Sequence, residues 1–251
     1  MKIALITGAT SGIGEAIALK FAQKDINVII TGRRLDKLNA LKSNITSNTK
    51  ANILALKMDV TDRKSVEREI NGLPDEWKSI DILVNNAGLA VGLDPIQHGN
   101  PDDWEQMIDT NLKGLLYVSK AVLPLMIARQ KGHIINIGSI AGKEVYPKGN
   151  VYCATKHAVD ALTKSMRIDL LGNGIKVTQI APGLVETEFS LVRFKGDEER
   201  ASKVYQGYKP LEGKDIAEIA FFITTLPDHV CVNDILMTPL AQANSTIVDK
   251  K

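Results

Sequence analysis

The chain has 251 residues, of which 44% are hydrophobic and 24% are charged, and its formal net charge at pH 7 is +2. A chain of this length and apolar content can bury one large core and does not require a second, so we expect a single domain over residues 1–251. Because acidic and basic residues are spread along the chain, no charged patch indicates a nucleic-acid or membrane partner.

Short β-branched runs alternate with longer amphipathic segments along the whole chain. The runs predict strands at Ile3–Thr7, Asn27–Thr31, Asn52–Met58, Asp81–Asn85, His133–Gly138, Lys176–Ala181 and Asp234–Met237. The segments predict helices at Ile13–Lys24, Asp36–Asn44, Arg63–Asn71, Pro101–Arg129, Val151–Leu171, Glu198–Tyr205 and Lys214–Thr225. This alternation indicates an α/β fold with a doubly wound parallel sheet and helices on both faces. Ligands of such sheets bind beyond the carboxyl ends of the strands, near the point where strand order reverses.

The turn after the first predicted strand is rich in glycine. It reads Thr-Gly-Ala-Thr-Ser-Gly-Ile-Gly and contains Gly8, Gly12 and Gly14. Glycine permits positive φ and lets a pyrophosphate approach the main chain, while the following helix offers unpaired N–H groups. The spacing departs from the Gly-x-Gly-x-x-Gly dinucleotide fingerprint. The turn predicts a phosphate cradle, and the alternative is a tight turn that binds nothing.

The second predicted strand ends in Thr31-Gly32-Arg33-Arg34. An NAD site usually places Asp or Glu here to bond the ribose 2′-hydroxyl, and this chain has neither. Arg33 and Arg34 can instead neutralise a 2′-phosphate through their forked guanidinium groups. The pair therefore predicts NADP as the cofactor; the alternative is two solvated charges at a helix start.

Tyr152 and Lys156 are one helical turn apart, and Ser139 lies at the end of an apolar, strand-like run thirteen residues upstream of Tyr152. A phenol that transfers protons near neutral pH must have its pKa brought from about 10 to about 7, which takes roughly 4 kcal/mol of preferential phenolate stabilisation. The ammonium of Lys156 is the expected source of that stabilisation, together with the positive nicotinamide ring when the oxidised cofactor is bound. Together with the glycine turn, the three side chains predict an oxidoreductase.

Other kinds of site find no support in the sequence. Ser139 lacks the Gly-x-Ser-x-Gly elbow of a hydrolase. Cys153 and Cys231 match no metal or disulfide spacing, and the histidines share no ligand spacing, so we expect reduced thiols and no metal. The apolar run after Met1 is too short for a signal peptide, and no apolar stretch approaches membrane-spanning length. We therefore expect a cytosolic protein.

Over its entire length the sequence resembles the short-chain dehydrogenase/reductase superfamily. The resemblance rests on the glycine turn, Asp59-Val60, Asn85-Asn86-Ala87-Gly88, Asn111, Ser139, Tyr152-x-x-x-Lys156 and Pro182-Gly183, in the superfamily's order and approximate spacing. It implies a Rossmann-type fold and NADP-dependent hydride transfer. The cofactor-binding residues that it implies or that the chain itself suggests are Gly8, Thr10, Ser11, Gly12, Ile13, Gly14, Arg33, Arg34, Asp59, Val60, Asn86, Ala87, Gly88, Tyr152, Lys156, Pro182, Gly183, Val185 and Thr187.

The resemblance also implies roles for the catalytic residues. Tyr152 would exchange a proton with the substrate oxygen, and Lys156 would hold the nicotinamide ribose as well as tune the phenol. Ser139 would orient the substrate oxygen by a hydrogen bond. Asn111 would support a water chain from Lys156 to solvent; by itself, it would read as a polar residue tolerated in a helix.

Substrate choice should lie in residues 184–211, which form a mobile lid in the superfamily. This segment resembles the branch of NADP-dependent 3-hydroxy acid dehydrogenases acting on serine, allo-threonine and 3-hydroxypropionate, with malonic semialdehyde in reverse. A small anionic substrate needs a cation, and Arg193 is the candidate for its carboxylate, the alternative being an exposed surface arginine. Other functions compatible with the sequence are a broad NADPH-dependent carbonyl reductase and a non-catalytic nicotinamide-binding regulatory protein.

We expect a homotetramer. The two long predicted helices, Pro101–Arg129 and Val151–Leu171, carry more apolar positions than one buried face requires. The equivalent helices pair between subunits in the superfamily, giving closed symmetric dimers and tetramers.

Overall fold

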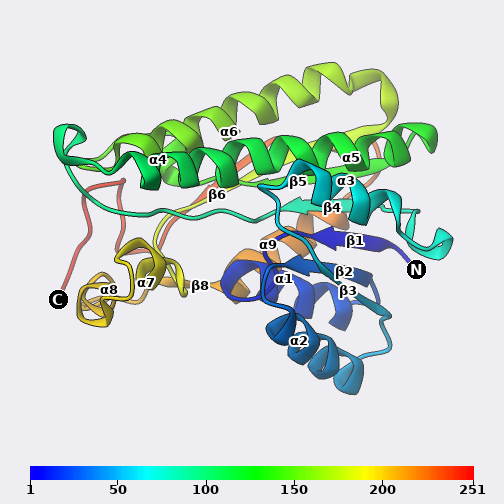
Figure 1. The fold of residues 1–251 in the computed structure, drawn as a ribbon, viewed down its shortest axis with the longest axis horizontal. Helices are drawn as coiled ribbons and strands as arrows, with labels where there is room; N and C mark the ends of the chain where they lie inside the picture. The colour runs from blue at the N-terminus through cyan, green and yellow to red at the C-terminus, as the bar shows by residue number, and fades with distance from the viewer.

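Seven strands form one parallel sheet in the computed structural model, which describes residues 1–251 (Figure 1). They are β1 (Ile3–Ile6), β2 (Asn27–Gly32), β3 (Ile53–Lys57), β4 (Ile82–Asn85), β5 (Gly132–Ile137), β6 (Ile175–Pro182) and β9 (Asp234–Met237). Their order is β3-β2-β1-β4-β5-β6-β9, so strand order reverses between β1 and β4. Leu5 of β1 lies opposite Ile29 of β2 and Leu83 of β4. The doubly wound α/β fold predicted from the sequence is confirmed.

Helices cover both faces of the sheet (Figure 1). One face carries α1 (Gly12–Gln23), α2 (Leu35–Asn48) and α9 (Gly213–Thr224); the other carries α3 (Arg63–Asn71), α4 (Pro101–Ile108), α5 (Leu115–Ala128) and α6 (Asn150–Asp169). Strand β1 shows why two cores form, because successive side chains point to opposite faces of a strand. Ala4 and Ile6 join the core under α1 and α9, whereas Ile3 and Leu5 join the core under α5 and α6.

The expected long helix over 101–129 is continuous, but it contains a π-helical turn at Asp109–Gly114 between α4 and α5. By length and composition alone, Pro101–Ala128 is apolar enough to cross a membrane, which corrects the expectation that no stretch of the chain would be. Its apolarity has a structural use here. Leu115, Val118 and Val122 of α5 are buried in the core on this face of the sheet.

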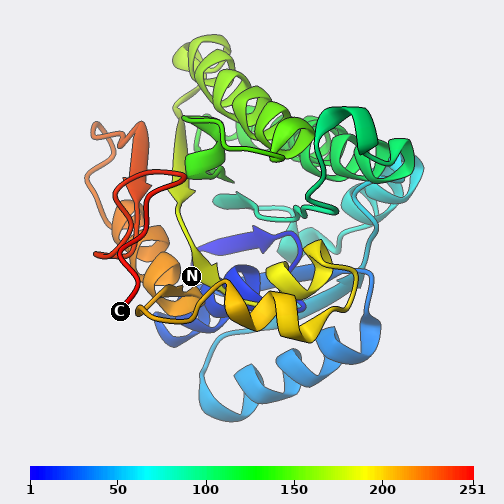
Figure 2. The ribbon, with the colours of Figure 1, turned by 90° about the vertical axis from the view of Figure 1, so that its left-hand side faces the viewer.

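Residues 184–211, called the lid segment below, cross the molecule beyond the carboxyl ends of the strands (Figures 1 and 2). They contain α7 (Phe189–Arg193) and α8 (Glu198–Lys203). The two short parallel strands β7 (Val185–Glu186) and β8 (Leu211–Glu212) pair with each other and hold the two ends of the lid segment together. Only the helix at α8 was predicted from the sequence. The C-terminal residues run beside the lid segment, where Lys251 N donates to Gly207 O at 2.8 Å.

Candidate active site

A cleft of about 580 Å³ opens at the carboxyl edge of the sheet, beneath the lid segment. It collects side chains and main-chain groups from nearly every predicted motif. The predicted residues that line it are Gly8, Thr10, Ser11, Gly12, Ile13, Arg33, Arg34, Asp59, Val60, Asn86, Ala87, Gly88, Ser139, Tyr152, Lys156, Pro182, Gly183, Val185, Thr187 and Arg193. Gly14 and Asn111 were also predicted, and the structure places both behind the lining rather than in it.

The glycine turn follows β1 at the reversal of strand order, where it meets the residues after β4. Gly8 has φ of +66°, and a Cβ built there would lie 2.9 Å from Ala87 Cα. The side chain of Asn86 donates to Thr7 O at 2.8 Å, which fixes the two turns against each other. A Cβ on Gly14 would lie 2.4 Å from the Asn86 side chain. Gly14 is therefore a packing residue here, because close contact between the turns excludes any side chain.

The same turn presents the start of α1 to the cleft. Ser11 is the N-cap of α1, yet its side chain does not cap the first-turn N–H groups. Uncapped N–H groups and the positive end of the helix dipole together make an anion site. Gly12 adopts φ of +59° and leaves room beside Thr187. These residues fit the pyrophosphate of a dinucleotide.

The two arginines after β2 differ in their surroundings. Arg34 donates from Nη2 to Thr10 Oγ1 at 2.9 Å and to Ser11 Oγ at 3.0 Å, and from Nη1 to Glu188 of the lid segment at 3.0 Å. Arg33 is exposed at the edge of the cleft, and its guanidinium has no partner in the protein. An unpaired guanidinium group at this position could bind a 2′-phosphate through two parallel hydrogen bonds.

The adenine end of the cleft is formed at the end of β3. Asp59 accepts hydrogen bonds from the N–H of Thr61 at 3.0 Å and from its hydroxyl at 2.8 Å, so its carboxylate also fixes the local turn. Val60 is buried and packs against Gly114, where a Cβ would come within 2.7 Å of the valine side chain. Asp59 therefore both stabilises the local turn and lines the cleft.

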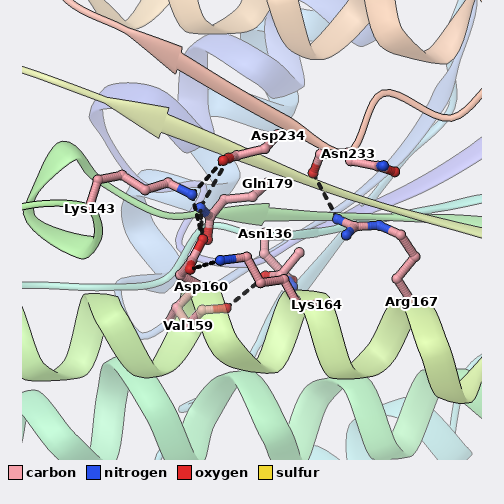
Figure 3. Close-up of polar contacts among 10 residues, drawn as sticks. Asn136, Lys143, Val159, Asp160, Lys164, Arg167, Gln179, Asn233 and Asp234 are labelled. Carbon is pink, nitrogen blue, oxygen red and sulfur yellow. Dashed lines mark hydrogen bonds and ion pairs between the residues drawn. The ribbon is translucent and has the colours of Figure 1, made fainter.

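Ser139 lies two residues after the end of β5 and caps a short 3₁₀ turn at Ile140–Gly142, where its side chain accepts a hydrogen bond from Ala141 N at 3.1 Å. The residue after this turn is Lys143, which forms ion pairs with Asp160 of α6 and Asp234 of β9 (Figure 3). Gln179 of β6 donates to Asp160 at 2.9 Å in the same cluster. Lys143 thus attaches the serine turn to two separate elements, α6 and β9, and Gln179 of β6 holds the α6 partner in place, which restricts the position of the hydroxyl.

Tyr152 lies in the first turn of α6 and Lys156 lies one turn later, with Lys156 Nζ 6.0 Å from the centre of the Tyr152 ring. Nζ donates to Ile137 O at 2.9 Å. Burial raises the pKa of the Tyr152 phenol, against which a hydrogen bond with Ser139 acts, and burial lowers the pKa of Lys156 to about 8. The phenol pKa is raised because desolvation penalises the phenolate more than the neighbouring protein groups stabilise it, whereas the expected depression refers to the complex with oxidised cofactor.

Asn111 lies in the π-helical turn between α4 and α5, and such turns are frequent at functional sites. Its Oδ1 accepts from Leu89 N at 2.8 Å, and its Nδ2 donates to Leu89 O at 2.8 Å and to Thr155 Oγ1 at 3.1 Å. A Cβ on Gly88 would lie between Asn111 Oδ1 and Lys156 Nζ, at 3.2 Å and 3.5 Å. Asn111 therefore stands behind Lys156, on the side away from the cleft.

Arg193, at the end of α7, reaches into the cleft from the lid segment. Its guanidinium lies 5.3 Å from the ring of Tyr146 and 5.7 Å from that of Tyr152, and its buried Nε has no hydrogen-bond partner. Arg193 therefore places a cation with an unsatisfied donor beside the Tyr152 phenol. Arg193 is thus part of the cleft and not an exposed surface residue.

Several lining residues were not predicted from the sequence. Phe189 lies 5.6 Å from the Tyr152 ring, and Tyr146, Phe194 and Tyr205 add to the same wall. Gln242, in the C-terminal segment, accepts from Leu184 N at 2.8 Å and leaves no room for a side chain at Gly183. No local pattern marks these residues, since only the fold brings the C-terminal segment and α7 to the cleft.

Comparisons with known proteins agree with this geometry. The model of the short chain dehydrogenase family matches residues 2–197. The chain is 49% identical over 242 residues to the NADP-dependent 3-hydroxy acid dehydrogenase YdfG of Salmonella typhi and 48% identical to that of Escherichia coli strain K12, with 96% of each chain covered. The solved closed form of serine dehydrogenase complexed with NADP+ is 47% identical, with a TM-score of 0.94 and 99% of each chain covered.

Proposed function

The chain belongs to the short-chain dehydrogenase family, and from this membership we infer that it is an NADP-dependent oxidoreductase of small 3-hydroxy acids of the serine, allo-threonine and 3-hydroxypropionate type. It interconverts the CH–OH group of the hydroxy acid and the carbonyl group of its oxidised form, and the nicotinamide cofactor accepts or supplies the hydride. The observation that carries this function is the convergence of Ser139, Tyr152 and Lys156 beside a dinucleotide-shaped cleft. Two relatives at 48–49% identity bear the name of this activity.

Residues of the cleft fit NADP along its whole length. The glycine turn and the start of α1 would hold the pyrophosphate, Asp59 and Val60 would contact the adenine, and Arg33 would meet the 2′-phosphate. When bound, the nicotinamide supplies or accepts the hydride. Asn86–Gly88 and the cleft residues Pro182, Gly183, Val185 and Thr187 would border it. Glycine is required at Gly183 because Gln242 leaves no room for a side chain there.

Tyr152 would give a proton to the substrate oxygen in reduction and remove it in oxidation. Ser139 supports this role, because its turn is fixed by Lys143 and the presence of its hydroxyl opposes the rise in the pKa of the phenol. Lys156 would bind the ribose hydroxyls and raise the positive potential at the phenol. Asn111, bonded to Leu89 and Thr155, would hold the backbone from which a water chain leads away from Lys156.

The substrate carboxylate is assigned to Arg193. A small hydroxy acid that bonds Ser139 and Tyr152 through its hydroxyl would reach this guanidinium with its charged end, and Nε has no competing partner. A charge-assisted hydrogen bond of this kind contributes about 1.5–3 kcal/mol. The aromatic wall of Tyr146 and Phe189 also favours a second candidate, a broader carbonyl reductase for ketones or aldehydes.

The two functions are separated by following NADPH absorbance across a panel of 3-hydroxy acids, uncharged alcohols and ketones. We expect NADP to be used at least tenfold better than NAD, which is about 1.4 kcal/mol. Arg193→Ala should raise KM for serine and leave an uncharged alcohol nearly unchanged. Parallel losses on both substrates would show that Arg193 has a structural role. Better turnover of uncharged ketones or aldehydes than of 3-hydroxy acids by the wild type would favour the broad reductase, and no turnover of any compound would favour a nicotinamide-binding regulatory protein.

We also propose a cytosolic homotetramer. Exposed apolar side chains gather on the outer helices, with Ile127 of α5 at 38% exposure, and Ile168 at 76% and Leu171 at 82% at the end of α6. Such a surface fits pairing of these helices between subunits. Light scattering at micromolar concentration should give four times the mass of the chain, and a monomeric mass would contradict the proposal.

A further inference from the structure

The lid segment is attached to the two rims of the cleft in different ways. On the substrate rim, Gly92 N donates to Arg193 O at 3.0 Å, and Lys195 pairs with Asp103 of α4 at 2.8 Å. On the cofactor rim no main-chain hydrogen bond joins the segment to the glycine turn or to α2. The attachment there consists of side-chain contacts of Glu188. The cofactor rim is therefore the edge that can part without breaking backbone pairing.

Glu188 is bound by two cations across the mouth of the cofactor groove. Its Oε2 accepts from Arg34 Nη1 at 3.0 Å and its Oε1 accepts from Lys37 Nζ of α2 at 2.8 Å. Ser11 of the glycine turn accepts a hydrogen bond from Arg34 Nη2 at 3.0 Å, so the arginine joins the carboxylate to that turn. The hydrogen bond from Lys37, reinforced by Arg34, lowers the pKa of Glu188 to about 2, so the group is ionised at every physiological pH.

The same contacts separate the roles of the two arginines. All three nitrogens of the Arg34 guanidinium are occupied, Nε and Nη2 by the glycine turn and Nη1 by Glu188. Arg33 has no partner and is free to meet a phosphate. A bound 2′-phosphate therefore need not break the contact between Arg34 and Glu188.

We propose that Glu188, held by Arg34 and Lys37, is a latch that closes the lid segment over the bound dinucleotide and sets its release rate, whereas Arg33 alone discriminates the 2′-phosphate. The inference rests on the proposed function in that a nicotinamide dinucleotide occupies the groove. The latch acts equally on NADPH and NADH, because it joins protein to protein. Its partners are about 40% exposed, so its effect is moderate and sensitive to salt.

The first test measures cofactor release by stopped-flow fluorescence after NADPH or NADH is displaced with excess oxidised cofactor. Glu188→Gln should accelerate release of both about three- to tenfold, and 1 M NaCl should erase most of the difference from wild type. Glu186→Gln, at an exposed lid position without an ion pair, is the matched control and should change nothing. Arg33→Ala should weaken NADPH alone.

The second test needs no cofactor. Trypsin should cut the lid segment of Glu188→Gln faster than that of wild type or Glu186→Gln in the cofactor-free protein. Tighter binding of NADPH alone in Glu188→Gln would show that the carboxylate competes with the 2′-phosphate, and unchanged release with unchanged proteolysis would also overturn the latch. If wild type binds neither dinucleotide, the proposed function fails, and the trypsin comparison still decides whether Glu188 holds the segment closed.

Discussion

Lys156 is the residue whose replacement should separate stability from function most clearly. Its side chain is only 6% exposed and its pKa falls from 10.5 to about 8 through burial. At about 1.4 kcal/mol for each pH unit, holding the ammonium in the folded protein at pH 7 costs about 3 kcal/mol. Lys156→Met keeps the volume and removes the charge. It also removes the charge-assisted hydrogen bond to Ile137 O, a loss of about 2 kcal/mol, so the variant should be about 1 kcal/mol more stable at pH 7.

The sign of the pH dependence provides an internal check. Because the pKa of Lys156 is lower in the folded than in the unfolded chain, the unfolded chain binds more protons between about pH 8 and pH 10.5. The free energy of unfolding of the wild type therefore rises with pH through that window. Below about pH 8 the full cost of burying the charged ammonium is present. The advantage of Lys156→Met should accordingly be largest at pH 7 and should shrink as pH approaches 10.

Urea unfolding followed by circular dichroism, without cofactor and at one protein concentration, measures this difference, since self-association also stabilises the fold. Lys42→Met on the exposed face of α2 is the control and should leave stability unchanged at both pH 7 and pH 9.5. Turnover by Lys156→Met should be lost although the protein is more stable. A variant less stable than wild type at pH 7, or a gain that does not vary with pH, would refute the reasoning.

Two further replacements test the catalytic turn and the phenol. Tyr152→Phe should keep the fold and NADPH binding and lower turnover by about 10²- to 10⁴-fold, the range for a positioned proton donor, and near-normal turnover measured by NADPH absorbance would remove its assigned role. Lys143→Met should lower kcat about tenfold, because Ser139 loses its fixed position, with little effect on the KM for NADP. Lys143→Arg should keep most of the wild-type kcat, because an arginine can still pair with Asp160 and Asp234. Equal losses of kcat in both variants would show that the ion pairs do not position the serine.

The parts of the molecule that the sequence predicted are those governed by local rules. The central strands are buried on both faces and therefore tend to be apolar along their length, as in β1, where Ile-Ala-Leu-Ile is buried throughout. The glycine turn and the Tyr152–Lys156 spacing are equally local. Elements of the lid segment were missed because β7, α7 and β8 are two to five residues long, too short for a periodic pattern to emerge.

Site features that depend on distant contacts could not be predicted. Arg34 was expected to meet a phosphate, and its pairing with Glu188 joins residues 154 positions apart. Gln242 reaches the cleft only because the C-terminal segment passes beside Gly183. The pKa of Tyr152 was expected to fall from the proximity of Lys156, yet its direction is set by burial, which sequence spacing does not report.

Burial affects Tyr152 and Lys156 in a common direction, since it favours the neutral form of each. In the cofactor-free protein the phenol is therefore a proton donor that is ready for reduction, whereas oxidation needs a phenolate. If the positive ring of oxidised NADP supplies the missing stabilisation, bringing the phenol from 10 or above to about 7 takes at least about 4 kcal/mol. Ultraviolet difference titration at 295 nm between wild type and Tyr152→Phe measures this phenolate directly. We expect no Tyr152 phenolate below pH 10 without cofactor and a phenolate near neutral pH with NADP⁺; a phenolate near pH 7 in the cofactor-free protein would show that Lys156 alone overcomes the cost of burial.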